Sequence, residues 1–98
     1  MEEIENILSE YKEQILNEKA ILLNKKILDL TIELDKTKIE RNKLMFDLKK
    51  SGKTLKTLSE IFELSPKAVF DVTLNEERGY KTALKRRYEK NLAKILSP

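Results

Sequence analysis

The chain contains no cysteine and no histidine, and it has only two glycines and two prolines in 98 residues. Without cysteine, neither a disulfide nor a thiolate metal site is possible, which fits a reducing compartment. Without histidine, the commonest general base and metal ligand is missing, so we expect no enzyme, no metal site and no cofactor. No apolar run reaches membrane-spanning length, and the acidic N-terminal segment is unlike a signal peptide. We therefore expect a cytoplasmic protein without membrane contact.

The composition predicts an all-α fold. Charged residues make up 38% of the chain, well above the usual quarter, and hydrophobic residues 40%. Since almost nothing interrupts helices, we expect a helical oligomerisation arm over residues 1–50. A helix-turn-helix-like domain with a basic C-terminal helix should follow over residues 51–98, beginning with a hinge at Ser51-Gly52-Lys53. A monomeric core would be small, so self-association would add stability.

The arm carries apolar residues at the four-three spacing of a coiled-coil seam. They fall at Ile4, Leu8, Tyr11 and Ile15, and then in a shifted frame at Leu16, Ala20, Leu23, Ile27, Leu30 and Leu34. One helix of this length, about 70 Å, is not stable alone and needs a partner for its stripe. We expect it to pair with a second copy through Leu16, Leu23, Ile27, Leu30 and Leu34. The alternative is a helical hairpin within one chain, with softer points at Asn17, Asn24 and Thr31.

Two short helices are predicted between Lys53 and Leu74. Ser65 followed by Pro66 is a strong helix-start signal, because serine accepts first-turn N–H groups and proline fits the first helical position. One helix should therefore end near Phe62 to Leu64 and the next should begin at Pro66. Apolar residues at Leu58, Ile61, Phe62, Leu64, Val69 and Val72 would face one another across the turn.

This stretch resembles the helix-turn-helix of bacterial and phage regulators and of recombinase DNA-binding domains. The matching residues are Leu58 and Ser59 in the first helix, Phe62, Glu63 and Leu64 at the turn, and Ser65, Val69 and Val72 in the second helix. The resemblance covers residues 53–74 only. The turn residue of the motif is usually glycine, so Glu63 departs from the pattern and would be strained at positive φ. A plain helical hairpin is the alternative for these residues.

The charge distribution agrees with an anionic partner for the second half of the chain. The net side-chain charge is −3 through Leu48 and +6 from Lys49 onward. The resemblance implies that the helix from Pro66 enters the major groove of double-stranded DNA and that a homodimer reads two half-sites. The expected DNA-binding residues are Lys53, Lys56, Ser65, Lys67, Ala68, Phe70, Asp71, Lys85 and Arg86.

The last helix should begin between Leu74 and Tyr80, with Thr73 and Glu76 as a capping box, and run to about Leu96. Its basic faces carry Lys81, Lys85, Arg86, Arg87, Lys90 and Lys94, which either rest on phosphates or are simply solvated. A second function stays open, because Glu63, Phe70 and Asp71 suit a protein partner better than DNA. In that case the chain would be an adaptor or inhibitor that binds another protein through helical surfaces.

Overall fold

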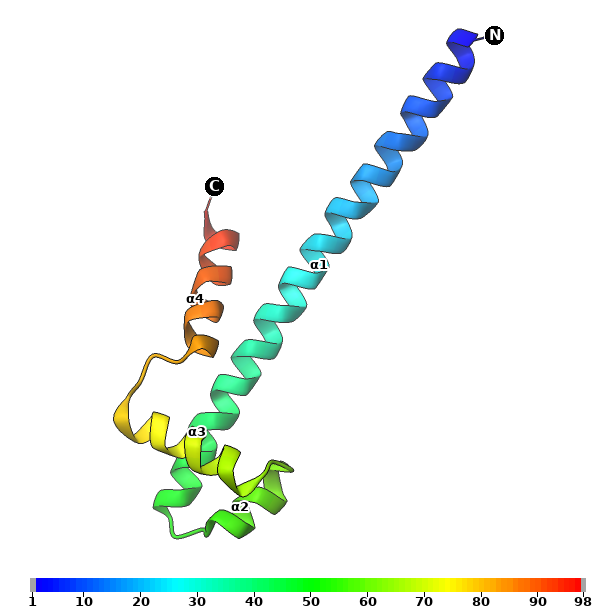
Figure 1. Cartoon of the computed structure of the whole chain (residues 1–98). Helices are drawn as coiled ribbons and strands as arrows, with labels where there is room; N and C mark the ends of the chain where they lie inside the picture. Colours follow the sequence, from blue (N-terminus) through cyan, green and yellow to red (C-terminus); the bar gives the residue numbers. More distant parts are fainter. Residues whose placement is uncertain (1, 98) are drawn as a thin grey trace. The chain divides into compact units, whose positions relative to one another are not determined.

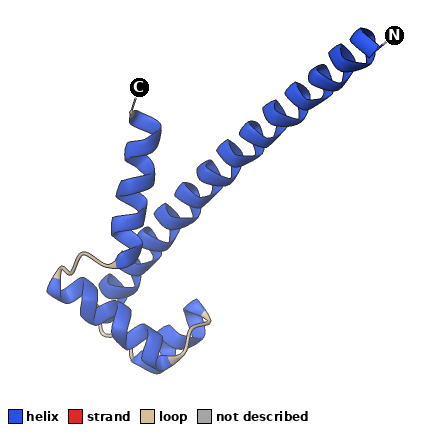
Figure 2. Cartoon of the chain, turned by 45° about the horizontal axis from the view of Figure 1, so that its top comes forward, coloured by secondary structure: helices blue, strands red, loops and turns tan. Residues whose placement is uncertain are grey.

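The computed structural model describes residues 2–97 and has four helices and no strand over that range (Figure 1, Figure 2). They are α1 (Glu2–Lys50), α2 (Leu55–Phe62), α3 (Pro66–Arg78) and α4 (Ala83–Leu96). The prediction of an all-α chain, with one long helix followed by shorter ones, is confirmed. None of these helices combines the length and the apolar character that crossing a membrane requires.

Helix α1 is continuous over 49 residues, which excludes a hairpin within residues 2–50. The three softer points stay helical because asparagine and threonine cost only tenths of a kcal/mol in a helix interior. Thr31 is accommodated by donating its hydroxyl to the carbonyl of Ile27 at 2.7 Å. Acidic residues in the first turn and Lys49 and Lys50 in the last turn complement the helix dipole at both ends.

The predicted hinge ends α1 as expected. Gly52 has φ 106°, and its N–H donates to the carbonyl of Lys49 at 3.0 Å. The hydroxyl of Ser51 donates to the carbonyl of Leu48 at 2.7 Å. The next helix is capped by Thr54, whose hydroxyl oxygen accepts from the N–H of Thr57 at 3.2 Å. Both helix ends are therefore fixed by local hydrogen bonds.

The predicted boundary between the last two helices is wrong. Thr73 is not a cap: it is fully buried in the middle of α3, where its hydroxyl donates to the carbonyl of Val69 at 2.9 Å. Helix α3 continues to Arg78 because Gly79, at φ 66°, supplies the left-handed residue that ends it. Helix α4 then starts at Ala83, and Thr82 caps it by accepting from the N–H of Lys85 at 3.4 Å.

The chain divides into two compact units, one ending at Thr31 and the other beginning at Ile32. The division falls inside α1 because the last part of that helix contributes Met45 to the core of the second unit. Met45, Leu58 and Val69 are fully buried there, and Leu48, Leu55, Phe62, Leu64 and Val72 pack around them. The core is small. Burying its three central side chains stabilises the unit by roughly 1.5–3 kcal/mol each.

Three hydrophobic residues are more exposed than their spacing predicts. Ile61 is 53% exposed, so it does not join the other apolar residues of α2 in the core. At the end of α4, Ile95 and Leu96 are also exposed, while Leu84, Tyr88 and Leu92 are half-buried. The last turn of α4 therefore contributes no buried apolar side chain.

Candidate nucleic-acid interface

The turn between α2 and α3 contains one residue with a positive φ. Glu63 adopts the left-handed conformation, with φ 54° and ψ 42°, although it is not a glycine. The N–H of Leu64 donates to the carbonyl of Ser59 at 3.2 Å, and the Ser59 hydroxyl donates to the carbonyl of Leu64. A small residue suits position 59 because its side chain lies directly against the turn. These hydrogen bonds hold the positive φ of Glu63 in place.

Ser65 and Pro66 start α3 as predicted. The Ser65 hydroxyl oxygen accepts from the N–H of Ala68 at 3.1 Å, and Pro66 occupies the first turn. Leu58 and Val69, from the two facing helices, are both fully buried. Two helices joined by three residues thus enclose a common apolar contact, which is the internal packing shared by a helix-turn-helix and a plain hairpin. Only the residues on the outer face of α3 can therefore distinguish a DNA-binding helix-turn-helix from a plain hairpin.

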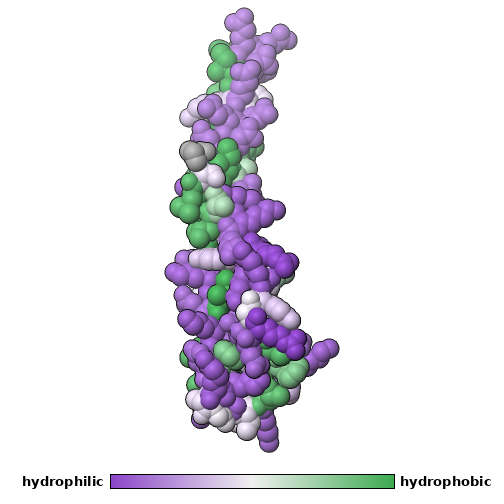
Figure 3. All heavy atoms as spheres, turned by 90° about the vertical axis from the view of Figure 1, so that its left-hand side faces the viewer, coloured by the Kyte–Doolittle hydropathy of each residue, from purple (hydrophilic) through white to green (hydrophobic). Residues whose placement is uncertain are grey.

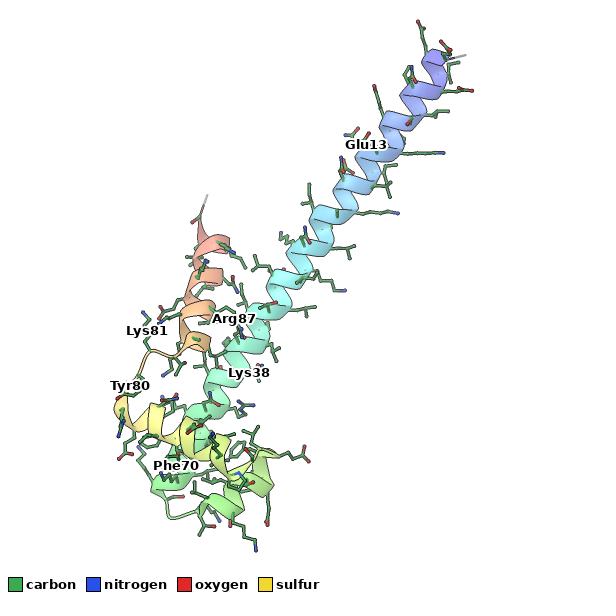
Figure 4. The ribbon with its side chains drawn as sticks, viewed as in Figure 1. Glu13, Lys38, Phe70, Tyr80, Lys81 and Arg87 are labelled. Atoms are coloured by element: carbon green, nitrogen blue, oxygen red, sulfur yellow. The ribbon has the colours of Figure 1, made fainter. Side chains whose placement is uncertain are left out.

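That outer face exposes most of the residues expected to meet base edges. Lys67, Phe70 and Asp71 are exposed, and Ala68 is half-buried. Since these positions are three and four residues apart, they share one side of the helix. The ring of Phe70 is 45% exposed, and the ammonium nitrogen of Lys49 lies 5.9 Å from its centroid (Figure 4). The face is therefore mixed, with a cation, an aromatic ring and a carboxylate.

The expected phosphate-binding residues near α2 are accessible. Lys53 in the turn before the helix and Lys56 in its first turn are both exposed, and neither has an acidic partner among residues 2–97. Ser65 is exposed as well. Its oxygen serves the cap, but the hydroxyl hydrogen remains available to donate to a phosphate oxygen.

The basic residues around α4 separate into paired and unpaired sets. The ammonium of Lys85 lies 3.2 Å from a carboxylate oxygen of Glu76, and that of Lys81 lies 2.7 Å from one of Glu89. These pairs offset the charge of Lys85, an expected DNA-binding residue, and of Lys81, which precedes the helix (Figure 4).

Arg86, Lys90 and Lys94 form the unpaired set. All three are exposed and have no acidic partner among residues 2–97. Because they are spaced by four residues, they lie along one side of α4. Of the three, only Arg86 is among the residues expected from the sequence to bind DNA. Lys90 and Lys94 extend its positive stripe, as their four-residue spacing already indicated.

A pairing that the sequence did not predict joins α1 to α4. Arg87 donates to both carboxylate oxygens of Asp35, at 2.8 and 2.6 Å, and the side chain of Asp35 is 1% exposed (Figure 4). The hydrogen bonds from Arg87 hold the pKa of Asp35 below its ordinary value of 3.8, despite burial, and the charges of Arg87 and Lys38 act in the same direction. The pKa of Arg87 is raised by the same contact. Arg87 thus uses two of its five N–H donors to hold α4 to α1.

One sequence signal could have indicated this pair. Asp35 lies three residues after Ile32 and four before Ile39, on the side of α1 that is buried. A carboxylate on such a face requires a cation, although the spacing alone does not say which one. Among residues 2–97, no group of acidic residues is placed to hold a metal ion and no cavity is found. These residues therefore present surfaces only.

The residues expected to form a dimer are exposed throughout. Leu16, Leu23, Ile27 and Leu30 are 64%, 61%, 61% and 59% exposed in the first unit, and Leu34 is 54% exposed in the second. In the face drawn in Figure 3, hydrophobic side chains form green patches between hydrophilic ones. Pairing through these residues stays a prediction.

Comparisons with models of known protein families, with curated proteins and with solved structures gave no match. The resemblance to helix-turn-helix proteins consequently rests on the residues between Lys53 and Leu74 and on nothing else.

Proposed function

We propose that this chain is a small sequence-specific DNA-binding regulatory protein that acts as a homodimer. One observation carries the proposal: α2 and α3 bury Leu58 against Val69 across a left-handed turn, which leaves Lys67, Phe70 and Asp71 exposed on α3. A helix held in this way, with a free outer face, suits insertion into the major groove.

Each exposed residue of α3 has a matching chemistry on base edges. Lys67 can donate to O6 and N7 of guanine, and Asp71 can accept from N4 of cytosine. Phe70 can contact the methyl group of thymine. Asp71 also repels phosphate, so it favours a geometry in which α3 points into the groove and not along the backbone. The mixed face therefore supports sequence-specific more than non-specific binding.

Phosphate contacts come from the exposed cations outside α3. Lys53, Lys56 and the positive stripe of Arg86, Lys90 and Lys94 have no acidic partners among residues 2–97. Lys85 contributes less than the sequence predicts, because binding a phosphate would require it to leave Glu76. Such contacts set affinity and register, whereas the bases set specificity.

Titration with duplex DNA at several salt concentrations tests the proposal. If four to six phosphates are neutralised, log affinity should fall against log salt with a slope of about −4 to −5. Replacing Arg86, Lys90 and Lys94 by glutamine should make that slope shallower by about 2.7, because each contact contributes about 0.9. The matched control replaces the paired Lys81 and Lys85 by glutamine and should change the slope much less. No retention of DNA at low salt would end the proposal.

A second function is favoured by one observation, the exposure of Phe70. Exposed aromatic rings are common anchors in protein interfaces, and the neighbouring Asp71 is unfavourable near DNA. On this reading the chain is a helical interaction module that binds or inhibits another protein. The double variant Lys67→Glu/Arg86→Glu separates the two. DNA binding lost with the fold intact supports the regulator, and an unchanged DNA affinity supports the module.

A further inference from the structure

The first unit exposes large apolar side chains that need a partner. Those of the two seam frames are Ile4 (63%), Leu8 (54%), Tyr11 (62%), Leu16 (64%), Leu23 (61%), Ile27 (61%) and Leu30 (59%). An isolated helix of this length is marginal in water, and apolar surface of this extent marks an interface. Since the two frames differ, the direction in which a partner helix runs decides which side chains meet.

The apolar positions are mirrored about the point where the frame changes. Ile15 and Leu16 adjoin that point, and the other seam positions between Ile4 and Ile27 lie at equal distances on its two sides: Tyr11 with Ala20, Leu8 with Leu23, and Ile4 with Ile27. Two copies running in opposite directions and crossing at Ile15/Leu16 therefore bring every one of these residues level with an apolar counterpart. The change of frame then falls on the twofold axis.

The sizes of two of these residues also favour opposite directions. In an antiparallel pair, the ring of Tyr11 lies level with the small side chain of Ala20, and large meets small on both sides of the axis. In a parallel pair, two Tyr11 rings would crowd one level and two Ala20 methyl groups would leave a gap at another. Overpacking and cavities both destabilise an interface.

The charges of the first unit make the same distinction. Residues 2–16 carry five glutamates and one lysine, a net charge of −4, whereas residues 17–31 carry a net charge of +1. Antiparallel copies place Glu5 level with Lys26, although they also set Lys12 level with Lys19 and Glu13 level with Glu18. Parallel copies would instead set the two acidic segments side by side. The opposed helix dipoles of an antiparallel pair add a smaller favourable contribution.

We infer that two copies of this chain pair antiparallel through residues 4–27, with the twofold axis at Ile15/Leu16. Of the expected dimer residues, Leu16, Leu23 and Ile27 lie within this pair, whereas Leu30 and Leu34 lie beyond it. The inference rests on the homodimer of the proposed function, and it names the partner of the exposed face as a second copy in the opposite direction. Each chain then leaves the pair at the end opposite to its twin.

Single cysteines in this cysteine-free chain test the direction. Leu8→Cys and Leu23→Cys chains, one of them carrying a mass tag, are oxidised separately and as a mixture. The antiparallel pair predicts a mixed disulfide at a yield about tenfold above that of either chain alone, because the two thiols are held at one level. Leu16→Cys is the matched control, since residues near the axis cross-link with themselves in either direction. Ile4→Cys with Ile27→Cys repeats the test at the outer levels.

Each result decides the direction. Self-linking of the Leu8→Cys chain at high yield, or no link above the diffusional background in any variant, would overturn the inference. Titrating the same variants with duplex DNA under reducing conditions tests the proposed DNA binding separately from the antiparallel direction. If the cross-links showed a parallel pair and DNA binding were retained, the antiparallel direction would be refuted and the proposed function would stand. If the cross-links showed an antiparallel pair but no variant bound DNA, the proposed DNA-binding function would be refuted and the direction would stand.

Discussion

The carboxylate of Asp35 in α1 receives both of its hydrogen bonds from the guanidinium of Arg87 in α4, at 2.8 and 2.6 Å. The two residues are 52 positions apart in the sequence. Arg87 remains half exposed, whereas Asp35 has almost no contact with water. This contact joins the two helices where their apolar packing is slight, because α4 leaves Ile95 and Leu96 outside.

We expect Asp35→Asn to lower the free energy of unfolding of the second unit by about 1 kcal/mol. The amide keeps the shape of the carboxylate but loses the charge-assisted bidentate contact. The effect is modest because solvent reaches Arg87 and screens the pair. Urea unfolding followed by circular dichroism measures the change. The control is Asp47→Asn, since Asp47 lies in an exposed pair with Lys50, and a loss as large as that of Asp35→Asn would contradict the assignment.

The same pair predicts a pH dependence. Because the pKa of Asp35 is lowered on folding, its stabilising contribution is complete above its ordinary pKa of 3.8 and is lost as the pH falls through the lower, folded value. The stability difference between the native chain and Asp35→Asn should therefore be constant near neutral pH and shrink below about pH 3.8. Urea titrations from pH 2 to 7 on both proteins measure it. A difference that grows as the pH falls would reverse the sign and refute the cause.

Replacing Glu63 by glycine should stabilise the turn. The residue sits at φ 54°, where an ordinary side chain costs about 1 kcal/mol and glycine costs nothing. We expect Glu63→Gly to raise the free energy of unfolding by up to that amount. Glu60→Gly, in the exposed interior of α2, is the control and should lower it by about 1 kcal/mol. A destabilised Glu63→Gly variant would mean that the Glu63 side chain contributes more than its strained backbone costs.

Ser65 allows the fold and the proposed DNA contact to be tested separately. Ser65→Ala removes the cap of α3 and should cost about 1 kcal/mol of stability. Ser65→Asp retains a capping oxygen and suits the positive end of the helix dipole, so stability should be preserved. Its negative charge would nevertheless repel phosphate, and duplex affinity should fall about tenfold. Unchanged affinity in Ser65→Asp would remove this residue from the interface.

A charge swap tests the inferred antiparallel pair without cysteine. Glu5→Lys alone, or Lys26→Glu alone, should weaken self-association about tenfold, since each creates two like-charge contacts per dimer. The double variant Glu5→Lys/Lys26→Glu should restore the native affinity. Sedimentation equilibrium gives the three dissociation constants. If Glu5→Lys strengthened association, the two acidic segments would have to lie together in a parallel pair.

Local signals correctly predicted the helix ends that depend on neighbouring residues. Gly52, Thr54 and the Ser65-Pro66 step lie where the structure ends or begins helices, because a cap is formed within one turn of chain. The predicted helix boundary near Thr73 was wrong because it also rested on local residue types alone. Thr73 and Glu76 have capping residue types, yet packing buried Thr73, and the next local stop signal, Gly79, ended the helix instead.

What the sequence determined by itself is therefore the all-α character and the turn between α2 and α3, each a property of residues close along the chain. It left open whether residues 2–50 form one helix or a hairpin, and the structure decided that. Only the tertiary structure decided which basic side chains pair with a carboxylate and which stay unpaired. Lys85 meets Glu76, Lys81 meets Glu89 and Arg87 meets Asp35, while Arg86 stays exposed. No local pattern distinguishes these cations, because a basic side chain is neutralised or left free by the carboxylates that the fold brings near it.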